Sequence, residues 1–474
     1  MKTAKSFFLF LIFLLVITFK LSAQQLKGKP NVIFILADDL GYGDLGCYGQ
    51  QKIQTPNIDE LAKEGIRFTQ FYAGTSVCAP SRASLLTGLH TGHTAVIGNM
   101  GMEPEGQFPI PDSAFTIAEM FKKAGYTTGD FGKWGLGPVG SSGDPIKQGF
   151  DSFYGYNCQS LAHDYFPDHL WNNDLRVDLP NTIDNQTSYA GDLIQQKALD
   201  FITSNKSKPF FLYLSYTLPH AALQLPENDP RLTSYKKLFN EDAKPIKTGD
   251  GKGYQPQAYP HAAYAAMVQR LDDYVGQVVG QLKKLGLDKN TLIVFTSDNG
   301  PHKEGGNTPE FFNSNGGYRG IKRDLYEGGI RVPMIMRWPA MIEKGKTSNQ
   351  TGAFWDFLPT FAELVQQPLK TKVDGISIMP TIISKGNQQQ HEYFYWEFHE
   401  NGGRQAVRMG EWKGVRLNVR QNPDGDIQLY HLRNDPYETK DLKAEQPEIV
   451  KKINNIMQEA HLENADFPLI TRKK

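Results

Sequence analysis

The residues with the clearest chemical potential lie in one short segment, Cys78-Ala79-Pro80-Ser81-Arg82. A proline close after Cys78 and Gly88 ten positions later are typical of the two ends of a short helix. Residues four apart lie on the same side of a helix, so Arg82 is expected beside Cys78. A helix N-terminus offers free N–H groups and a positive field. The pattern therefore predicts an anion-binding site that contains a nucleophile.

The longer run from Cys78 to Gly88, CAPSRASLLTG, resembles the signature of the formylglycine-dependent sulfatases of the alkaline-phosphatase superfamily. In that family the cysteine is converted to formylglycine (3-oxoalanine), and the hydrate of this aldehyde attacks the sulfate ester. The resemblance implies the same fate for Cys78 and a maturation enzyme as a partner. The alternative is an unmodified cysteine at a helix start, either inert or redox-active.

Oxygen donors follow two apolar runs of the chain, at Asp38-Asp39 and at Asp298-Asn299. Ligand sets made only of oxygen suit a hard cation such as calcium or magnesium. The resemblance implies one Ca²⁺ ion held by these four residues and by the modified Cys78. Related phosphatases that hold two zinc ions carry histidine at the position of Asn299. Zinc prefers nitrogen and sulfur ligands, so an amide oxygen argues against that class.

A sulfate ester also needs cationic partners and a group that protonates the leaving alcohol. By resemblance, Arg82, Lys133 and Lys322 are the cations and His220 is the general acid. The family usually carries histidine two positions after the first lysine, whereas this chain has Gly135. This departure brings the release of sulfate into question. We expect another histidine to take over, His163 in the first place and His302 as the alternative.

Three segments give the chain the look of a carbohydrate sulfatase: residues 155–159 (GYNCQ), 170–172 (LWN) and 395–398 (YWEF). The substrate expected from this likeness is an O-sulfated sugar of a glycan, of galactose type. The expected sugar contacts are His163, Trp171, Gln224, His302 and Arg404. Two other functions fit the same residues. One is a phosphodiesterase or phosphonate hydrolase of the same superfamily. The other is a glycan-binding protein without turnover, suggested only by the departure at position 135.

Short apolar runs end in these polar residues and indicate the elements that position them. Residues 32–36, 127–131, 210–214 and 292–295 suit strands buried on both faces of a parallel sheet. Helical patterns lie between them, at residues 56–64, 189–203 and 264–285, and Thr116 with Glu119 forms a possible capping box. This alternation predicts an α/β fold, and the resemblance makes it an alkaline-phosphatase-like, mostly parallel sheet sandwiched by helices. Ligands bind beyond the carboxyl ends of such strands, where four separate elements deliver polar groups.

The chain divides into three expected parts. Residues 1–23 read as a secretory signal peptide, because lysines precede an apolar run too short for a comfortable membrane span. Residues 28–370 form the expected catalytic domain. Residues 371–474 are expected to form a smaller α+β subdomain, with strands at 412–417 and 427–432, an aromatic segment at 392–398 and a helix near 448–463.

Composition narrows the cellular setting and the partners. The 474 residues carry 51 basic and 51 acidic side chains, so no global field favours nucleic acid. The signal peptide predicts export to the periplasm or beyond, with no stable membrane span after cleavage. Three cysteines make no disulfide framework, and the sequence leaves open whether Cys47 and Cys158 pair.

Overall fold

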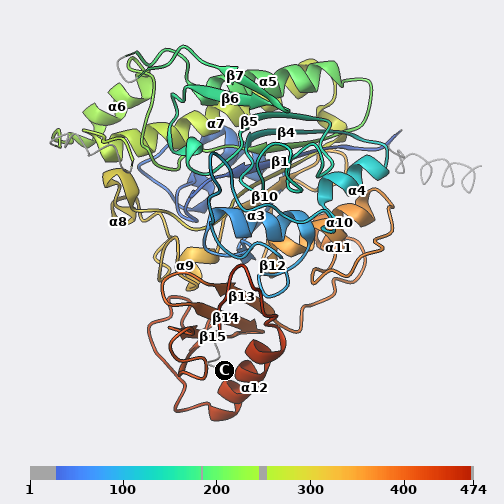
Figure 1. The fold of residues 1–474 in the computed structure, drawn as a ribbon, viewed down its shortest axis with the longest axis vertical. Helices are drawn as coiled ribbons and strands as arrows, with labels where there is room; N and C mark the ends of the chain where they lie inside the picture. The colour runs from blue at the N-terminus through green and yellow to red at the C-terminus, as the bar shows by residue number, and fades with distance from the viewer. Residues whose placement is uncertain (1–27, 183–184, 245–253, 471–474) are drawn as a thin grey trace, which may run out of the picture.

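The computed structural model describes residues 28–182, 185–244 and 254–470. The expected signal peptide therefore lies outside the described residues. A large α/β part carries the amino-terminal elements, and a smaller part at the carboxyl end packs below it in Figure 1. The large part is built on a sheet with strand order β11-β2-β10-β9-β1-β8-β4-β5-β6-β7.

The strands of this sheet are short, and the central ones are parallel. Their bounds are β1 (Asn31–Ala37), β2 (Ile66–Phe68), β4 (Thr127–Lys133), β5 (Ser152–Tyr156), β6 (His169–Asn172), β7 (Leu175–Asp178), β8 (Phe210–Ser215), β9 (Thr291–Ser297), β10 (Met334–Arg337) and β11 (Lys346–Ser348). Parallel pairing joins five consecutive strands of the sheet, β9, β1, β8, β4 and β5. Strands β6, β7 and β10 pair antiparallel. A separate pair joins β3 (Phe71–Tyr72) to β12 (Gly352–Ala353).

Helices of the large part cover both faces of this sheet, and one more helix, α12, belongs to the carboxyl-terminal part. Their bounds are α2 (Pro56–Lys63), α3 (Cys78–Thr87), α4 (Ile117–Lys123), α5 (Ala190–Ser204), α6 (Pro230–Phe239), α7 (Pro260–Lys284), α8 (Pro309–Phe312), α9 (Glu327–Ile330), α10 (Phe357–Leu364), α11 (Met379–Ile382) and α12 (Pro447–Glu459). The predicted capping box is present at the start of α4, where Thr116 and Glu119 exchange side-chain and backbone hydrogen bonds.

Strand β1 shows why the sheet is a central layer. All seven of its residues are buried. Ile33 and Ile35 belong to the core under α2, α5 and α7, whereas Val32 and Phe34 belong to the core under α3, α4 and α10. Successive side chains of a strand point to opposite faces, so a continuous apolar run requires cover on both sides. The predicted α/β sandwich is therefore confirmed.

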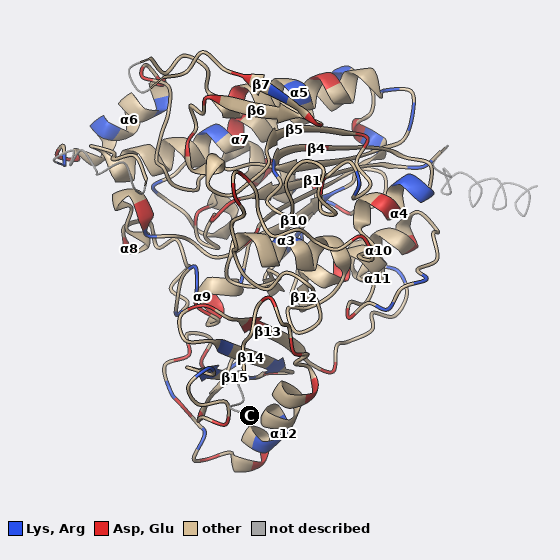
Figure 2. Ribbon diagram, in the orientation of Figure 1, with Lys and Arg blue, Asp and Glu red and all other residues tan. Residues whose placement is uncertain are grey.

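The carboxyl-terminal part is a four-stranded antiparallel sheet with one helix packed on it. Its strands are β13 (Phe394–Phe398), β14 (Arg404–Met409), β15 (Trp412–Leu417) and β16 (Ile427–His431), and α12 contacts three of them. Strand β14 was not predicted, because its sequence RQAVRM begins with two polar residues and carries a further arginine at Arg408. Figure 2 shows both kinds of charge spread over the large and small parts of the molecule. Among the described residues no helix combines the length and apolarity needed to cross a bilayer.

Candidate active site

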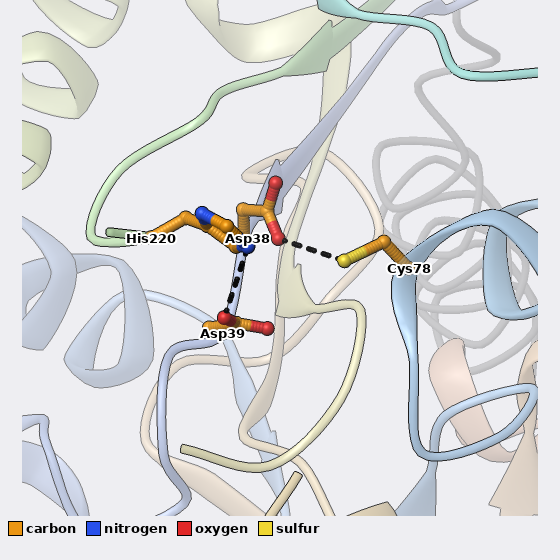
Figure 3. Close-up of side chains that lie close together, drawn as sticks. All are labelled: Asp38, Asp39, Cys78 and His220. Carbon is orange, nitrogen blue, oxygen red and sulfur yellow. Dashed lines mark hydrogen bonds and ion pairs between the residues drawn. The ribbon is translucent and has the colours of Figure 1, made fainter. Parts of the chain in front are cut away.

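Cys78 is the first residue of α3 and is 1% exposed. The helix ends at Gly88, whose φ of 71° suits a glycine at a helix C-terminus. The Cys78 Sγ donates to Asp38 Oδ1 at 3.3 Å, as Figure 3 shows. Burial, together with the Asp38 carboxylate, raises the thiol pKa. A protonated, buried thiol is a poor nucleophile, so the redox-active alternative finds no support in this setting.

Register places three carboxylates around that sulfur. Strands β1 and β9 are parallel neighbours with Ala37 opposite Ser297, so the residues that follow each strand lie side by side. The Asp39 N–H donates to Asp298 Oδ1 at 3.1 Å. Potential ligand atoms of four residues lie within 4.8 Å of one another: Asp38, Asp39, Cys78 and His220.

The donor set fits a hard divalent cation. Asn299 Oδ1 is buried and has no hydrogen-bond partner among the described residues, while its Nδ2 donates to Asp39 Oδ1 at 2.7 Å. Burial and the neighbouring Asp38 carboxylate raise the pKa of Asp298 to about 7. Clustered buried carboxylates repel one another, and a cation among them offsets that cost.

Two lysines bind neighbouring carboxylates of this cluster, one each. Lys133, the last residue of β4, places Nζ 2.5 Å from Asp38 Oδ2. Lys322 places Nζ 2.7 Å from Asp39 Oδ2, and both ammonium groups are buried. Burial alone would raise the pKa of Asp38, but the Lys133 ammonium and the Arg82 guanidinium hold it well below its usual range. Cations as well as carboxylates therefore lie close together at the carboxyl ends of these strands.

Arg82 differs from its expected place as a free cationic partner for an anion. Its Nε and Nη2 donate to Asp298 Oδ2 at 3.1 and 2.9 Å, and its Nη1 donates to the Lys133 carbonyl. Its Nη2 also lies 3.3 Å from Asp38 Oδ2. Because each end of the guanidinium is engaged, Arg82 holds the carboxylates and the end of β4 in place.

His220 lies between the carboxylates and Lys322. Its Nδ1 contacts the Ala221 carbonyl, and its Nε2 lies 3.0 Å from Lys322 Nζ and 3.4 Å from Asp39 Oδ2. Nδ1 must carry a proton to bond a carbonyl, so Nε2 offers its lone pair to the ammonium group. Burial and Lys322 hold the pKa of His220 well below 6.5, which leaves the ring neutral.

Two further rings pack against His220. The His163 ring stacks on it with centroids 5.1 Å apart and an interplanar angle of 6°. Tyr254 meets both imidazoles edge-on, at 4.9 Å from His163 and 5.8 Å from His220. Burial raises the pKa of Tyr254 to about 12, against the lowering effect of Lys322. Sequence reasoning missed Tyr254, which follows a glycine- and lysine-rich stretch and belongs to no recognisable motif.

Comparisons with known proteins agree with this arrangement. Residues 30–367 match the family model described as Sulfatase, and residues 317–464 match one described as N-sulphoglucosamine sulphohydrolase, C-terminal. The chain belongs to the sulfatase family. It is therefore an enzyme of the sulfuric ester hydrolase class, as the sequence analysis predicted.

Curated and solved relatives of this sulfatase cover most of its length. An N-acetylgalactosamine-6-O-sulfatase of Bacteroides thetaiotaomicron is 30% identical over 92% of this chain and 93% of its own. The N-acetylgalactosamine-6-sulfatase of Rattus norvegicus is 32% identical over 81% of this chain and 71% of its own. The crystal structure of Ps i-CgsB in complex with k-i-k-neocarrahexaose superposes with a TM-score of 0.77 and 31% identity, over 91% of this chain and 92% of that chain.

The structure gives a reason why this sulfatase has Gly135 where the family usually carries histidine. Gly135 has a φ of 71°, and a Cβ there would lie 2.3 Å from Gln159 Nε2. Gln159 is 7% exposed, and its Nε2 has no hydrogen-bond partner among the described residues. A buried amide thus fills the space beside residue 135. The left-handed backbone angle opposes a histidine at that position, whereas the Gln159 amide is the end of a flexible side chain and can move aside.

His302 lies at the edge of the site, with a ring nitrogen within 4.8 Å of an Asp39 carboxylate oxygen and its ring centroid 5.9 Å from that of His220. It is fully buried, its Nε2 lies 3.1 Å from the Pro219 carbonyl, and its Nδ1 accepts the Glu304 N–H at 3.1 Å. Both ring nitrogens are engaged, so the geometry supports neither a sugar contact nor a replacement base. Instead His302 ties down the loop that carries His220. His163, by contrast, is partly exposed, and burial and the two lysines lower its pKa to about 3.

The other residues that we expect to contact the sugar already make hydrogen bonds within the protein. Trp171 Nε1 donates to Glu105 Oε1 at 2.8 Å, and Gln224 Oε1 accepts the Tyr165 N–H at 2.9 Å. Arg404 Nη1 donates to the Arg323 carbonyl at 2.6 Å, which brings the small sheet beside the residue that follows Lys322. Cys47 and Cys158 are free thiols, so the pairing left open by the sequence is not formed.

Proposed function

We propose that this sulfatase removes an O-sulfate group from a galactose-type sugar of a glycan. Two kinds of observation support the substrate class. The named relatives include N-acetylgalactosamine-6-sulfatases, and the structure of Ps i-CgsB was solved in complex with k-i-k-neocarrahexaose. In this chain, buried ammonium groups converge beside Cys78, where a sulfate ester requires positive charge.

The proposed cofactors are one Ca²⁺ ion and a formylglycine made from Cys78 by a maturation enzyme. The residues that would hold the ion are Asp38, Asp39, Asp298, Asn299 and the modified side chain at position 78. When bound, the cation and the aldehyde hydrate supply a nucleophilic oxygen at neutral pH and a positive charge beside the sulfur atom.

The remaining chemistry falls to side chains of this chain. Lys133 and Lys322, which lie against Asp38 and Asp39, are the proposed donors to the sulfate oxygens. His220 Nε2 and Lys322 Nζ, 3.0 Å apart, hold a proton between them at the place of the leaving oxygen. An alcohol leaves poorly as an alkoxide, so this proton lowers the barrier for departure. His163 lies directly over His220 and is the proposed contact for the sugar.

The observation that carries the proposal is the position of Cys78, at the start of α3 and in contact with Asp38. The test is the intact mass of the peptide that contains Cys78, together with sulfate release from sulfated galactose and N-acetylgalactosamine. We expect the formylglycine mass, release of sulfate without phosphate from matched phosphate esters, and no turnover in Cys78→Ala. Turnover by Cys78→Ala would refute the assignment. Release of phosphate that is faster than release of sulfate would show that the protein is a phosphate ester hydrolase.

The metal proposal is tested separately through Asn299. Replacement by leucine keeps the volume but removes Oδ1, so we expect Ca²⁺ affinity to fall at least tenfold by titration calorimetry. A chelator should abolish sulfate release, and added Ca²⁺ should restore it. The exposed Asn387, changed to leucine, is the matched control. Unchanged affinity in Asn299→Leu would remove this residue from the proposed ligand set.

We further propose that the protein acts after export, in the periplasm or outside the cell. The support is the charged and apolar pattern of residues 1–23. N-terminal sequencing of the mature protein from its native host is expected to begin after Ala23. A chain that retains Met1 in the cytoplasm would contradict export.

A further inference from the structure

Arg323 is a positive charge at the edge of the active site that the proposed sulfate chemistry does not use. It follows Lys322, which is buried and binds Asp39, but its own side chain is 40% exposed. Its Nη1 donates to Glu304 Oε1, and neither Nε nor Nη2 makes a hydrogen bond to another described residue. The N–H groups of Nε and Nη2 lie parallel along one edge of the guanidinium group, which is the arrangement that binds two oxygens of one anion.

Glu304 holds this guanidinium group close to the reacting groups. A carboxylate oxygen of Glu304 lies within 4.8 Å of a carboxylate oxygen of Asp39. The Arg323 N–H donates to the carbonyl of Ser76, two positions before Cys78, at 2.9 Å. Arg323 is therefore attached to the active site through both its side chain and its backbone.

The backbone of Arg323 adopts a conformation that is uncommon for residues other than glycine. Its φ is 75°, in the left-handed region. Two hydrogen bonds hold this conformation, one to the Ser76 carbonyl and one from Arg404 Nη1 to the Arg323 carbonyl at 2.6 Å. Arg404 Nη1 also pairs with Asp324 Oδ1, so the carboxylate next to Arg323 in the sequence already has a cation. Strained backbone of this kind persists where the surrounding contacts fix it, and it is frequent at ligand-binding sites.

The loop that carries Glu304 lies on the side of the site where the sugar is expected. A Cβ on the next residue, Gly305, would lie 3.0 Å from Leu223 Cγ and 3.7 Å from Ala221 Cβ, and both of these residues closely follow His220. In the proposed function, the leaving oxygen of the sugar receives its proton at His220. The guanidinium group that Glu304 holds is thus placed to meet a substituent of the sugar.

Further positive charges surround this loop. Lys303 on the loop is exposed, and Lys244 Nζ donates to the Gly306 carbonyl at 3.2 Å. Glu304 pairs with Arg323 and so offsets only one of these three cations. The excess of positive charge favours an anionic group of the substrate over a neutral hydroxyl group.

We propose that Arg323 binds a second anionic group of the substrate, either another sulfate ester on the sulfated sugar or the carboxylate of a hexuronate joined to it. The free edge of the guanidinium group donates to two oxygens of that anion, while Glu304 keeps the side chain in place. The inference rests on the proposed function, because it takes the sulfated sugar to lie on the side of His220.

The test measures kcat/KM for sulfate release from two matched pairs of substrates. The first pair is a galactose-type sugar with one sulfate and the same sugar with two. The second pair is a disaccharide in which the sulfated sugar is joined to a neutral hexose and one in which it is joined to a hexuronate. We expect the second anion to raise kcat/KM at least about tenfold in one of the pairs, and that pair identifies the source of the anion.

Substitutions of Arg323 should act on this ratio. Arg323→Gln removes the charge and the paired donors, so it should bring the ratio close to one and change little on the substrates without a second anion. Arg323→Lys keeps the charge without the paired donors and should retain part of the ratio. The matched control is Arg433→Gln, because Arg433 pairs with Glu411 at 3.1 Å in an exposed ion pair of the small part, and it should leave the ratio unchanged.

Binding provides a readout that does not depend on turnover. In the Cys78→Ala background, calorimetry should show tighter binding of the substrate that carries the second anion. This difference should shrink as the salt concentration rises, and Arg323→Gln should remove it.

Equal kcat/KM values within both pairs, or the same ratio in Arg323→Gln as in the natural enzyme, would overturn the inference. Equal losses on every substrate in Arg323→Gln would also overturn it, because they are expected if Arg323 only holds the loop of Glu304. Absence of sulfate release from all of these substrates by the natural enzyme would instead contradict the proposed function.

Discussion

Buried ionisable groups at the active site stabilise one another only as a set. Asp38 alone would be strongly disfavoured in its charged form by burial, and the cations around it reverse that preference. Lys322 likewise keeps its proton, because the Asp39 carboxylate offsets the loss of hydration. Removal of one member leaves an uncompensated buried charge, which is costlier than the loss of the pair.

Asp130 gives a residue-scale prediction away from the proposed ligands. Its Oδ1 accepts from Ser215, its Oδ2 has no partner among the described residues, and burial raises its pKa from 3.8 to about 7. Between these values the native state binds more protons than the unfolded chain, so stability falls as pH rises from about 4 to about 7. Each pKa unit corresponds to about 1.4 kcal/mol.

Asp130→Asn mimics the protonated carboxyl and should therefore flatten this pH dependence by up to a few kcal/mol. The measurement is urea unfolding at several pH values between 4 and 7. The exposed Asp466, changed to asparagine, is the control. A variant with the same slope as the natural protein would show that Asp130 does not bind the extra proton.

The strands contribute to the active site mainly by positioning the residues at and just after their carboxyl ends. Strands β1 and β9 present carboxylates and β4 presents a lysine, because parallel neighbours end at the same edge. The loop after β8 adds His220 at that edge. The site therefore depends on register, since a slip of one residue would turn each side chain to the other face.

Helix α4 offers a prediction at the scale of one element. Thr116 caps it by accepting the Glu119 N–H at 3.1 Å, and its hydroxyl donates to the Gln148 carbonyl at 2.7 Å. Thr116→Ala removes both bonds and should cost about 1–2 kcal/mol of unfolding free energy. Urea denaturation measures this loss, and Thr371→Ala, at an exposed site, should change little. The bonds lost go to Glu119 and Gln148, which are not residues of the proposed active site, so kcat should change less than the free energy of unfolding.

At the scale of the whole molecule, a buried ionic cluster joins the small sheet to the large part. Lys413 of β15 is fully buried, with Nζ 2.9 Å from Glu327 and 3.1 Å from Glu438. Glu327 also binds Arg331 and accepts from the Tyr72 hydroxyl. These residues come from both parts, so the cluster fixes how the small sheet meets the catalytic part.

Lys413→Met should therefore destabilise the protein by about 3–5 kcal/mol, because two carboxylates lose their shared cation. Adding Glu438→Gln removes one of those charges and should recover part of the loss. Thermal unfolding and limited proteolysis after residue 370 provide the measurements. Lys451→Met on α12, at an exposed position, is the control. If Lys413→Met unfolds like the natural protein, the cluster does not hold the two parts together.

The sequence by itself determined the α/β class, the main strands and the family, because these depend on local apolar runs and on the contiguous segment from Cys78 to Gly88. It also indicated which residues gather at the strand ends, since parallel strands share an edge. The sequence did not predict the short antiparallel strands β6, β7 and β14. Their apolar patterns are weak or interrupted by polar residues, and they form only against a neighbouring strand.

Tertiary structure alone decided how the side chains are used. Arg82 binds carboxylates of the site, and His302 is buried against the loop that carries His220. Tyr254 contacts His163 although it lies 91 positions further along the chain. No local pattern encodes such contacts, because they depend on which loops meet after the sheet has formed. The space beside Gly135 is filled in the same way, by an amide from the neighbouring strand's loop.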